Sequence, residues 1–383
     1  MAELIFLLAV LFGAYTYLGY PFILKLLSLG RKAPGVGMAD EDWPMVSITV
    51  PAYNEEHQIA ETVESLLALD YPQDRRQILI VSDASTDRTD EIVRSYEDRG
   101  VQLVRQPERR GKTAAENAVA PLLQGDYVVN TDASIRIYPA SLKRLMAPFA
   151  DPEVGLVSSR DVSVGREGEE ANQGEAGYVG YEMWIRELET KVGGIVGASG
   201  SLYAIRRELH GQLLPEGLSR DFAAALITRE RGFRPVSQAS ATCVVPRAHS
   251  LRREYPRKVR TVTRGMETLY HKRALLNPFK HGLYAWMLFS HKVCRWALPW
   301  VGVAGLAALG FMSPEHPWAL GLFLASLAVV AVGAVGWMVG GDRPLPRFLS
   351  IPAFLLMANV AVLHATIQAL GGQRDAIWEP TRR

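Results

Sequence analysis

Cysteine is scarce in this chain of 383 residues, and Cys243 and Cys294 are the two present. Neither lies in a Cys/His spacing typical of a zinc site, so the sequence predicts no structural zinc. Two distant thiols also exclude a disulfide framework and indicate reduced cysteines in a cytoplasmic or membrane-embedded setting. Internal repeats and low-complexity tracts are lacking as well, which argues against a repeat architecture.

Charged residues are missing from four stretches, at residues 4–24, 297–314, 317–341 and 348–373. A membrane-spanning helix needs about 20 mostly apolar residues, so three stretches are long enough and 297–314 is marginal. The first stretch has neither the basic start nor the small-residue cleavage site of a secretory signal. We therefore expect a retained N-terminal anchor and about three C-terminal spans.

Basic residues beside these stretches predict the orientation. Lys25, Arg31 and Lys32 follow the first stretch, and Arg343 and Arg347 separate the last two. The positive-inside rule places both segments in the cytoplasm of a multi-pass protein of the cell (inner or plasma) membrane. The basic tail at 374–383 disagrees, because three C-terminal spans leave it outside.

Residues 247–273 are rich in Lys and Arg against only Glu254 and Glu267. Such a run next to membrane segments most often meets anionic lipid headgroups. No nucleic-acid-binding module accompanies it, so we expect a lipid bilayer as a partner and no nucleic acid.

Apolar strand-like runs at 46–53, 77–82, 101–104 and 126–131 alternate with helical patterns at 56–69, 86–99 and 111–123. This alternation predicts an α/β domain with a parallel, doubly wound sheet. Further on, 172–192 and 219–231 have helical patterns and 201–205 resembles a strand. Ligands of such sheets bind beyond the carboxyl ends of the strands, where Asp83 and Asp132 lie.

Each polar residue at these positions has a functional and a purely structural interpretation. Asp132 is a hard oxygen ligand for a divalent cation with a sugar-nucleotide diphosphate, and Asp83 suits hydrogen bonds to the nucleoside, although both also fit ordinary turns. Lys112 begins a helix, where phosphate binds, or is a solvated lysine. Gln106 replaces the first glycine of a P-loop and excludes that motif. Asp221 is either a general base or an acidic residue favoured by the helix dipole.

The order of these motifs along the chain carries a family resemblance. The set comprises Pro-Ala-Tyr-Asn-Glu-Glu at 51–56, Val-Ser-Asp-Ala-Ser-Thr-Asp at 81–87, Gly111-Lys112 with Asn117, Thr-Asp-Ala-Ser at 131–134, Gly-Ala-Ser-Gly-Ser at 197–201, and Arg220-Asp221. In this order the motifs resemble family 2 glycosyltransferases. The resemblance is greatest to the membrane-integrated branch of exopolysaccharide, hyaluronan, chitin-oligosaccharide and cellulose synthases.

The resemblance implies a GT-A (Rossmann-like) domain, a nucleotide-sugar donor and Mg²⁺ or Mn²⁺ as cofactor. Asp221 is then the catalytic base and Asp132 the metal ligand. The other implied nucleotide-sugar-binding residues are Pro51, Tyr53, Glu55, Asp83, Lys112 and Asn117, together with Asp132 itself. The residues implied at the acceptor or the product diphosphate are Gly200, Ser201, Arg220, Arg257 and Arg260.

Three positions depart from the family pattern. Ser134 stands where the metal motif often has a second aspartate, and Arg220 stands where an acidic residue often precedes the base. The Gln-x-x-Arg-Trp motif of processive synthases is reduced to Arg260, and Thr261 cannot stack on an acceptor sugar as tryptophan does. These departures argue against long-chain processive synthesis.

We therefore expect an N-terminal transmembrane anchor (1–30), a GT-A domain (38–250), basic interfacial helices (251–296), transmembrane helices (297–373) and a tail (374–383). The expected function is inverting transfer from a nucleotide-sugar, a UDP-sugar by preference, to a saccharide or lipid-linked saccharide in exopolysaccharide or cell-envelope glycan synthesis. The alternatives are a polyprenyl-phosphate glycosyltransferase and a non-catalytic nucleotide-sugar-binding membrane subunit. Oligomerisation stays open.

Overall fold

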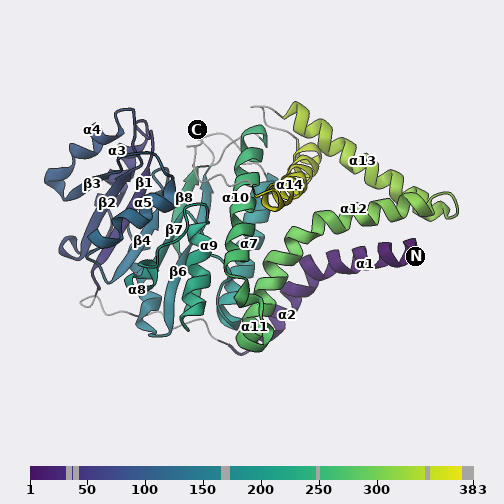
Figure 1. Cartoon of the computed structure of the whole chain (residues 1–383), viewed down its shortest axis with the longest axis horizontal. Helices are drawn as coiled ribbons and strands as arrows, with labels where there is room; N and C mark the ends of the chain where they lie inside the picture. Colours follow the sequence, from purple (N-terminus) through teal and green to yellow (C-terminus); the bar gives the residue numbers. More distant parts are fainter. Residues whose placement is uncertain (32–36, 38–42, 165–172, 247–250, 341–345, 373–383) are drawn as a thin grey trace.

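The computed structural model describes residues 1–31, 37, 43–164, 173–246, 251–340 and 346–372. A sheet domain forms one end of the molecule, and long helices project from it as an arm (Figure 1). The N-terminus lies at the far tip of this arm, away from the sheet domain.

One mixed sheet of eight strands, in the order β3-β2-β1-β4-β7-β6-β8-β5, organises the domain. The strands are β1 Val46–Ala52, β2 Arg76–Ser82, β3 Val101–Arg105, β4 Tyr127–Thr131, β5 Arg136–Ile137, β6 Val154–Val164, β7 Leu202–Arg206 and β8 Arg234–Pro246. β1 to β4 pair in parallel, which confirms the predicted parallel sheet for this half. The other half departs from that prediction, because β7 runs antiparallel to both β4 and β6.

Helices cover both faces of the sheet. They are α3 Ile59–Leu67, α4 Thr89–Arg94, α5 Lys112–Val119, α6 Ser141–Met146, α8 Arg207–His210 and α9 Arg220–Glu230. Alternate residues of one strand enter two separate cores: Ile78 and Ile80 pack with α3, α4 and α6, whereas Leu79 and Val81 pack with α5, α8 and α9. This alternation follows from the two-residue period of a strand, and it fixes which loops meet at the sheet edge.

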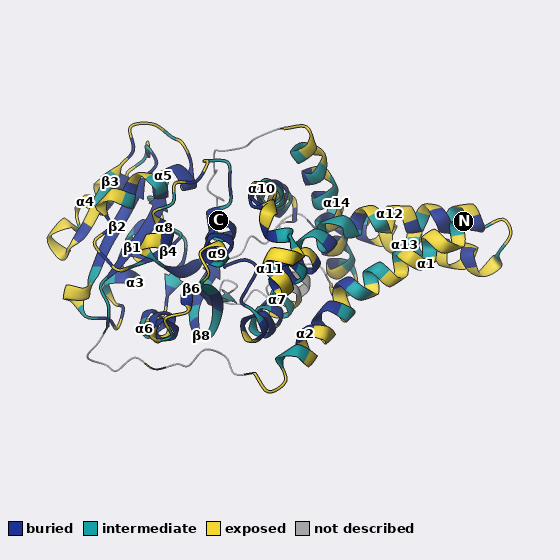
Figure 2. Ribbon diagram, turned by 60° about the horizontal axis from the view of Figure 1, so that its bottom comes forward, coloured by how far each residue is buried: buried dark blue, intermediate teal, exposed yellow. Residues whose placement is uncertain are grey.

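A second group of helices joins the sheet domain to the arm. These helices are α2 Tyr20–Ser28, α7 Gln173–Val192, α10 Leu251–His271 and α11 Pro278–Leu288. Tyr20, Ile185, Phe222 and Met287 contribute to one buried cluster that includes side chains of α2, α7, α9 and α11. The contact is apolar and buried, so the helix that carries Asp221 is packed directly against the base of the arm (Figure 2).

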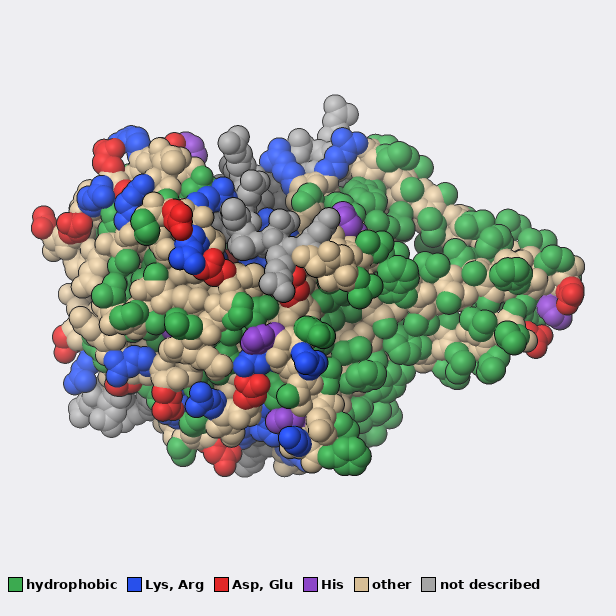
Figure 3. Space-filling model, in the orientation of Figure 1, with side chains coloured by type: hydrophobic (Ala, Val, Ile, Leu, Met, Phe, Trp, Pro, Cys, Tyr) green, Lys and Arg blue, Asp and Glu red, His purple; other side chains and the backbone are tan. Residues whose placement is uncertain are grey.

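The arm consists of α1 Ala2–Ala14, α12 Cys294–Met312 and α13 Pro317–Val339, with α14 Arg347–Leu370 at its base. Four helical stretches are long and apolar enough to cross a membrane: Ala2–Ser28, Pro278–Met312, Pro317–Val339 and Arg347–Leu370. The stretch that is marginal in the sequence is longer in the structure because, after a kink at Gly282, the rest of α11, the π-helical turn η7 (Phe289–Val293) and α12 follow one another as helix. Apolar side chains cover the visible surface of the arm, while charged side chains gather on the sheet domain (Figure 3).

α14 has a different direction from the other helices of the arm. It is seen nearly end-on in Figure 1 and runs across α12 and α13 in Figure 2. Its buried residues Ala353, Phe354 and Met357 pack with Leu251 of α10, which places the basic helix α10 beside an apolar one.

Candidate functional site

A cavity of about 590 Å³ lies between the sheet domain and the base of the arm. Its wall contains sheet-edge residues, the start of α9, the inner face of α10 and apolar residues of α12 and α14. The site residues predicted from sequence that line it are Glu55, Lys112, Asp132, Gly200, Ser201, Arg220, Asp221, Arg257 and Arg260. Pro51, Tyr53, Asp83 and Asn117 do not belong to this wall.

The loops after β1 and β2 lie side by side at the carboxyl edge of the sheet. Asn54 and Ala84 have φ values of 53° and 57°, an uncommon conformation for residues other than glycine. Asn54 accepts a hydrogen bond from the Thr86 backbone N–H at 2.8 Å, which ties the two loops together. Such backbone strain persists only where the surroundings hold it, and it clusters at functional sites.

Asp83 is buried directly after β2 and holds the start of α5. Its carboxylate accepts hydrogen bonds from the backbone N–H groups of Arg110 at 2.9 Å and Gly111 at 2.8 Å. Gly111 has a φ of +92°, which an L side chain rarely adopts. Beside this turn the Arg109 guanidinium lies 3.8 Å from the centroid of the Tyr53 ring. The arrangement offers a planar surface and a carboxylate near one another, but outside the cavity wall.

Lys112 and Asp132 form an ion pair at the sheet edge, one from the first residue of α5 and one from the residue after β4. The Lys112 ammonium also donates to the Gly200 carbonyl oxygen at 3.4 Å. Burial lowers the pKa of Lys112, but the Asp132 and Glu116 carboxylates outweigh burial and hold it above its ordinary value. Lys112 is therefore a permanent positive charge beside Asp132.

Asp132 fits a divalent cation only in a limited way. Within the described ranges no group of three or more His, Cys, Asp or Glu side chains is placed to hold a metal ion. Ser134 lines the same cavity, so the protein offers one hard carboxylate and a neighbouring hydroxyl. This set suits an ion such as Mg²⁺, which proteins often bind through one or two carboxylates plus substrate phosphates.

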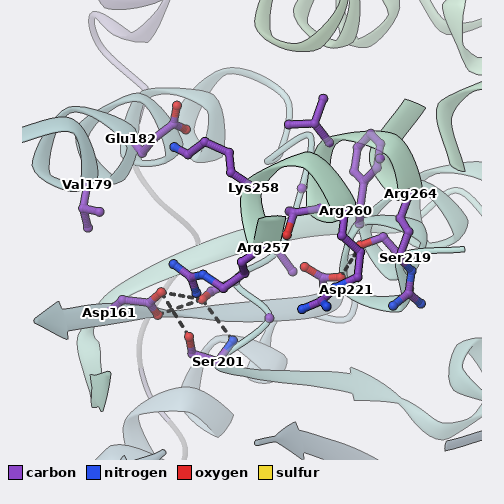
Figure 4. Close-up of a pocket in the computed structure, with 18 of the residues that line it drawn as sticks. Asp161, Val179, Glu182, Ser201, Ser219, Asp221, Arg257, Lys258, Arg260 and Arg264 are labelled. Atoms are coloured by element: carbon purple, nitrogen blue, oxygen red, sulfur yellow. Dashed lines mark hydrogen bonds between the residues drawn. The ribbon is translucent and has the colours of Figure 1, made fainter. Parts of the chain in front are cut away.

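Asp221 lies in the first turn of α9 and faces the cavity. Ser219 donates its hydroxyl hydrogen to Asp221 Oδ1 at 2.6 Å, and Arg260 and Arg264 approach from α10 (Figure 4). A Cβ atom at Gly200 would lie 3.1 Å from Asp221 Oδ2. The glycine therefore leaves space in front of this carboxylate oxygen, as a proton acceptor requires.

Arg220 and Asn117 belong to a buried polar group behind α9. The Arg220 side chain pairs with Glu116 at 3.3 Å, donates to the His210 carbonyl oxygen at 2.8 Å and donates to the Asn117 side-chain oxygen. Asn117 in turn donates to the Leu214 carbonyl oxygen at 2.8 Å. Both side chains thus have their hydrogen bonds inside the protein, where they hold α9 against α5.

Arg257 and Arg260 lie on the face of α10 that lines the cavity. The Arg257 guanidinium donates two hydrogen bonds to Glu254, at 2.9 and 2.6 Å. Arg264, one turn further on, donates to the Gly217 carbonyl oxygen at 3.1 Å. α10 therefore presents a row of guanidinium groups to the carboxylates of the sheet edge.

Sequence reasoning missed Asp161, which also lines the cavity. Its carboxylate accepts hydrogen bonds from the Ser199 hydroxyl at 2.7 and 2.9 Å and from the Ser201 hydroxyl at 3.2 Å (Figure 4). Asp161 follows the apolar run 154–157 within β6. The rule that drew attention to Asp83 and Asp132, an aspartate directly after an apolar strand, does not find Asp161, because three more residues of β6 follow it.

Comparison with known proteins links this geometry to a family. Residues 47–214 match the family model described as Glycosyl transferase family 2. A β-monoglucosyldiacylglycerol synthase from Nostoc sp. is 30% identical over 204 residues, covering 50% of this chain and 44% of that protein. An N-acetylglucosaminyltransferase from Rhizobium meliloti is 25% identical over 342 residues, covering 82% of this chain and 77% of that protein. The chain thus spans less than half of the first of these relatives.

The solved structure of the mannosyltransferase PcManGT from Pyrobaculum calidifontis, in complex with GDP-Man and Mn²⁺, superposes on this chain with a TM-score of 0.74. The match covers 98% of this chain and 100% of that one at 23% identity. At this identity the likeness shows the fold alone, and it confirms the GT-A architecture with its helical arm.

Proposed function

Because residues 47–214 match the family model described as Glycosyl transferase family 2, we propose that the chain is a membrane-bound inverting glycosyltransferase. Its donor is a nucleotide-sugar, and its acceptor is a saccharide or a lipid-linked saccharide of the cell envelope. One observation carries this proposal: Asp221, Asp132 and Lys112 line a single cavity between the sheet domain and apolar helices.

In the proposed reaction Asp221 accepts the proton of the acceptor hydroxyl through its Oδ2 side. The acceptor oxygen forms a bond to the anomeric carbon of the sugar while the bond from that carbon to the phosphate oxygen breaks. The nucleoside diphosphate leaves, and a single displacement inverts the anomeric configuration. Ser219 holds the other oxygen of Asp221 and so orients the base.

The second requirement of the reaction is that positive groups offset the negative charge of the leaving diphosphate. Asp132 would hold a Mg²⁺ or Mn²⁺ ion, which would supply positive charge to this diphosphate. Lys112 and Arg260 supply fixed positive charge from opposite walls of the cavity, one on α5 and one on α10. Tyr53 and Asp83, outside this wall, suit the base and ribose of the nucleotide.

The names of the similar proteins define the donors to test. They include a glucosyl lipid synthase, an N-acetylglucosaminyltransferase and a mannosyltransferase in complex with GDP-Man. A panel of UDP-glucose, UDP-N-acetylglucosamine and GDP-mannose therefore covers the neighbouring chemistries. The proposed donor is a UDP-sugar, and turnover of GDP-mannose alone would correct that part.

The test is nucleotide release by detergent-purified protein supplied with Mg²⁺ or Mn²⁺, with Asp221→Asn as the matched variant. The variant keeps the size of the side chain but removes the proton acceptor, so we expect release to fall by at least about 10²-fold. Donor affinity, measured by equilibrium dialysis, is expected to change little. Equal loss of donor affinity would contradict the role of Asp221, and donor binding without turnover would indicate a non-catalytic subunit.

A further inference from the structure

Three cationic side chains in the cavity wall come from the helices at the base of the arm and from the start of the arm itself. Arg186 comes from α7, Lys292 from η7 and Arg295 from the start of α12. The Arg295 side chain is only 9% exposed. None of the three is among the predicted donor-binding residues, and with Glu182 in the same wall they leave an excess of positive charge there.

Several donors on these side chains have no partner in the part of the chain that the structure describes. Arg186 Nη1 and Arg295 Nε and Nη2 are buried without a hydrogen-bond acceptor, although Arg295 Nη1 pairs with Glu182. Lys292 Nζ lies 5.2 Å from the centroid of the Phe222 ring and makes no hydrogen bond or ion pair with another described residue. Buried polar groups are normally satisfied, so open donors on a cavity wall indicate that a ligand supplies the acceptors.

The glycine-rich loop 197–201 relates these cations to the reacting groups. A Cβ atom at Gly197 would lie 3.5 Å from Lys292 Nζ, whereas one at Gly200 would lie 3.1 Å from Asp221 Oδ2. Gly200 also accepts the hydrogen bond from Lys112. Lys292 thus lies at one end of the loop, and Asp221 with the donor-side Lys112 lies at the other.

Beyond the cations the cavity wall becomes apolar. It contains Pro299 of α12 and Phe354, Leu355, Ala358 and Val362 of α14, with Asn359 as one polar residue among them. Both helices are long and apolar enough to cross a membrane. Pro299 lies one helical turn after Arg295, and Lys292 lies at the opposite end of the 197–201 loop from Asp221, so the cations stand between an apolar part of the wall and the carboxylate.

Building on the transfer reaction proposed above, we propose that Arg186, Lys292 and Arg295 bind the phosphate or diphosphate of a lipid-linked saccharide acceptor. Its hydrocarbon chain lies against α12 and α14, and its sugar hydroxyl reaches Asp221. The order of chain, phosphate and hydroxyl in such a molecule matches the order of the three parts of the wall. The hydroxyl proton passes to Asp221, its oxygen bonds to the anomeric carbon, and the nucleoside diphosphate departs.

A bare lipid phosphate fits this cavity less well as the nucleophile. Its phosphate oxygen would have to approach Asp221, and two negative charges at close range repel one another. A phosphate oxygen also carries no proton that a base must remove, so the open oxygen of Asp221 would have no role with such a nucleophile. The acceptor oxygen therefore belongs to a neutral hydroxyl beyond the phosphate.

The test is a binding measurement made without any donor, so its result does not depend on turnover. Farnesyl phosphate and farnesol, equal in chain and different in charge, are compared by equilibrium dialysis against wild type, Lys292→Gln and Arg186→Gln. Lys280→Gln, at an exposed lysine of α11, is the matched control for general surface charge. We expect wild type to bind farnesyl phosphate more tightly than farnesol. In each cavity variant the ratio of the two affinities is expected to fall about tenfold, and in the control it is expected to stay as in wild type.

Three outcomes would overturn the proposal. If wild type binds farnesyl phosphate and farnesol with equal affinity, the phosphate contributes nothing to binding and the proposed phosphate site is contradicted. Displacement by excess inorganic phosphate would assign the cations to a free anion instead of a lipid. A parallel loss of nucleotide-sugar affinity in Lys292→Gln would assign them to the donor. Donor turnover in wild type and Asp221→Asn tests the transfer reaction separately, so failure of one proposal is distinguishable from failure of the other.

Discussion

At the residue scale, the two oxygens of Asp221 have different surroundings. Oδ1 accepts the Ser219 hydroxyl at 2.6 Å, while Oδ2 faces the backbone of Gly200. The hydrogen bond selects one orientation of the carboxylate, and the glycine keeps the space in front of the other oxygen open. A carboxylate held in this way has a lone pair directed at the place that we propose for the acceptor hydroxyl.

Replacing Gly200 by Ala tests this arrangement. The new Cβ atom would lie 3.1 Å from Oδ2, so either the carboxylate or the loop must shift. Because small misplacements of reacting groups are costly, we expect transfer to fall about 10- to 100-fold with little change in thermal stability. Gly180→Ala is the control, since nothing lies within 4 Å of its Cβ position. Unchanged transfer in Gly200→Ala would show that the space at Oδ2 is not used.

At the element scale, α9 is positioned by the buried polar group that contains Arg220, Glu116 and His210. Burial raises the pKa of Glu116, whereas burial and then the Arg220 charge lower the pKa of His210 well below its ordinary value. Arg220 therefore works from inside the protein as a support for the helix that presents Asp221. This location explains why an arginine is tolerated directly before the proposed base.

The lowered pKa of His210 predicts a pH dependence of stability. In the unfolded chain this side chain takes up a proton near pH 6.5, whereas in the folded protein it stays neutral to lower pH. Stability is therefore complete above about pH 6.5 and falls below it, by up to about 1.4 kcal/mol per pH unit. In His210→Gln we expect the midpoint temperature of thermal denaturation to depend less on pH, between pH 7 and the pKa of His210 in the folded protein. The exposed His57 gives the control, His57→Gln, and an identical pH slope in both variants would contradict the assignment.

The elements also show where sequence patterns suffice. The runs at 46–53, 77–82, 101–104 and 126–131 are apolar and bounded by turns, so their strands were predictable, as were α7 and α9. β6 and β8 escaped because Gly155, Ser158 and Ser159 in one and Pro235 and Gln238 in the other interrupt the pattern. Asp161 lies inside β6 and not at its end, so a search for aspartates after strands did not find it. The approach of Lys292 to Gly197 depends on packing between distant elements, which local patterns do not reveal.

At the scale of the whole molecule, the direction of α14 bears on topology. α1, α12 and α13 run along the arm, while α14 runs across them beside the basic helix α10 (Figure 2). If α14 lies at the membrane surface, only three segments cross, and the end of α14 is on the same side as the sheet domain. The basic tail then agrees with the positive-inside rule, in contrast to the topology with three C-terminal spans.

Cysteine accessibility in intact cells tests this topology. Glu315 lies between α12 and α13 at the tip of the arm, and Gly371 directly follows α14. We expect Glu315→Cys to react with a membrane-impermeant maleimide from outside and Gly371→Cys to react only after permeabilisation. The native Cys243 and Cys294 are buried, so wild type serves as the background control. Labelling of Gly371→Cys from outside would restore α14 as a span.

Transfer of sugar from a nucleotide-sugar onto an acceptor in the membrane is the central claim, and one measurement tests it most directly. Purified protein in lipid nanodiscs that carry a membrane lipid extract is incubated with a donor labelled in its sugar, and the label is then divided between the water phase and the lipid phase. We predict label in the lipid phase with wild type and none with Asp221→Asn. Label that appears only as free sugar in water, or reaches the lipid equally with Asp221→Asn, would contradict the account.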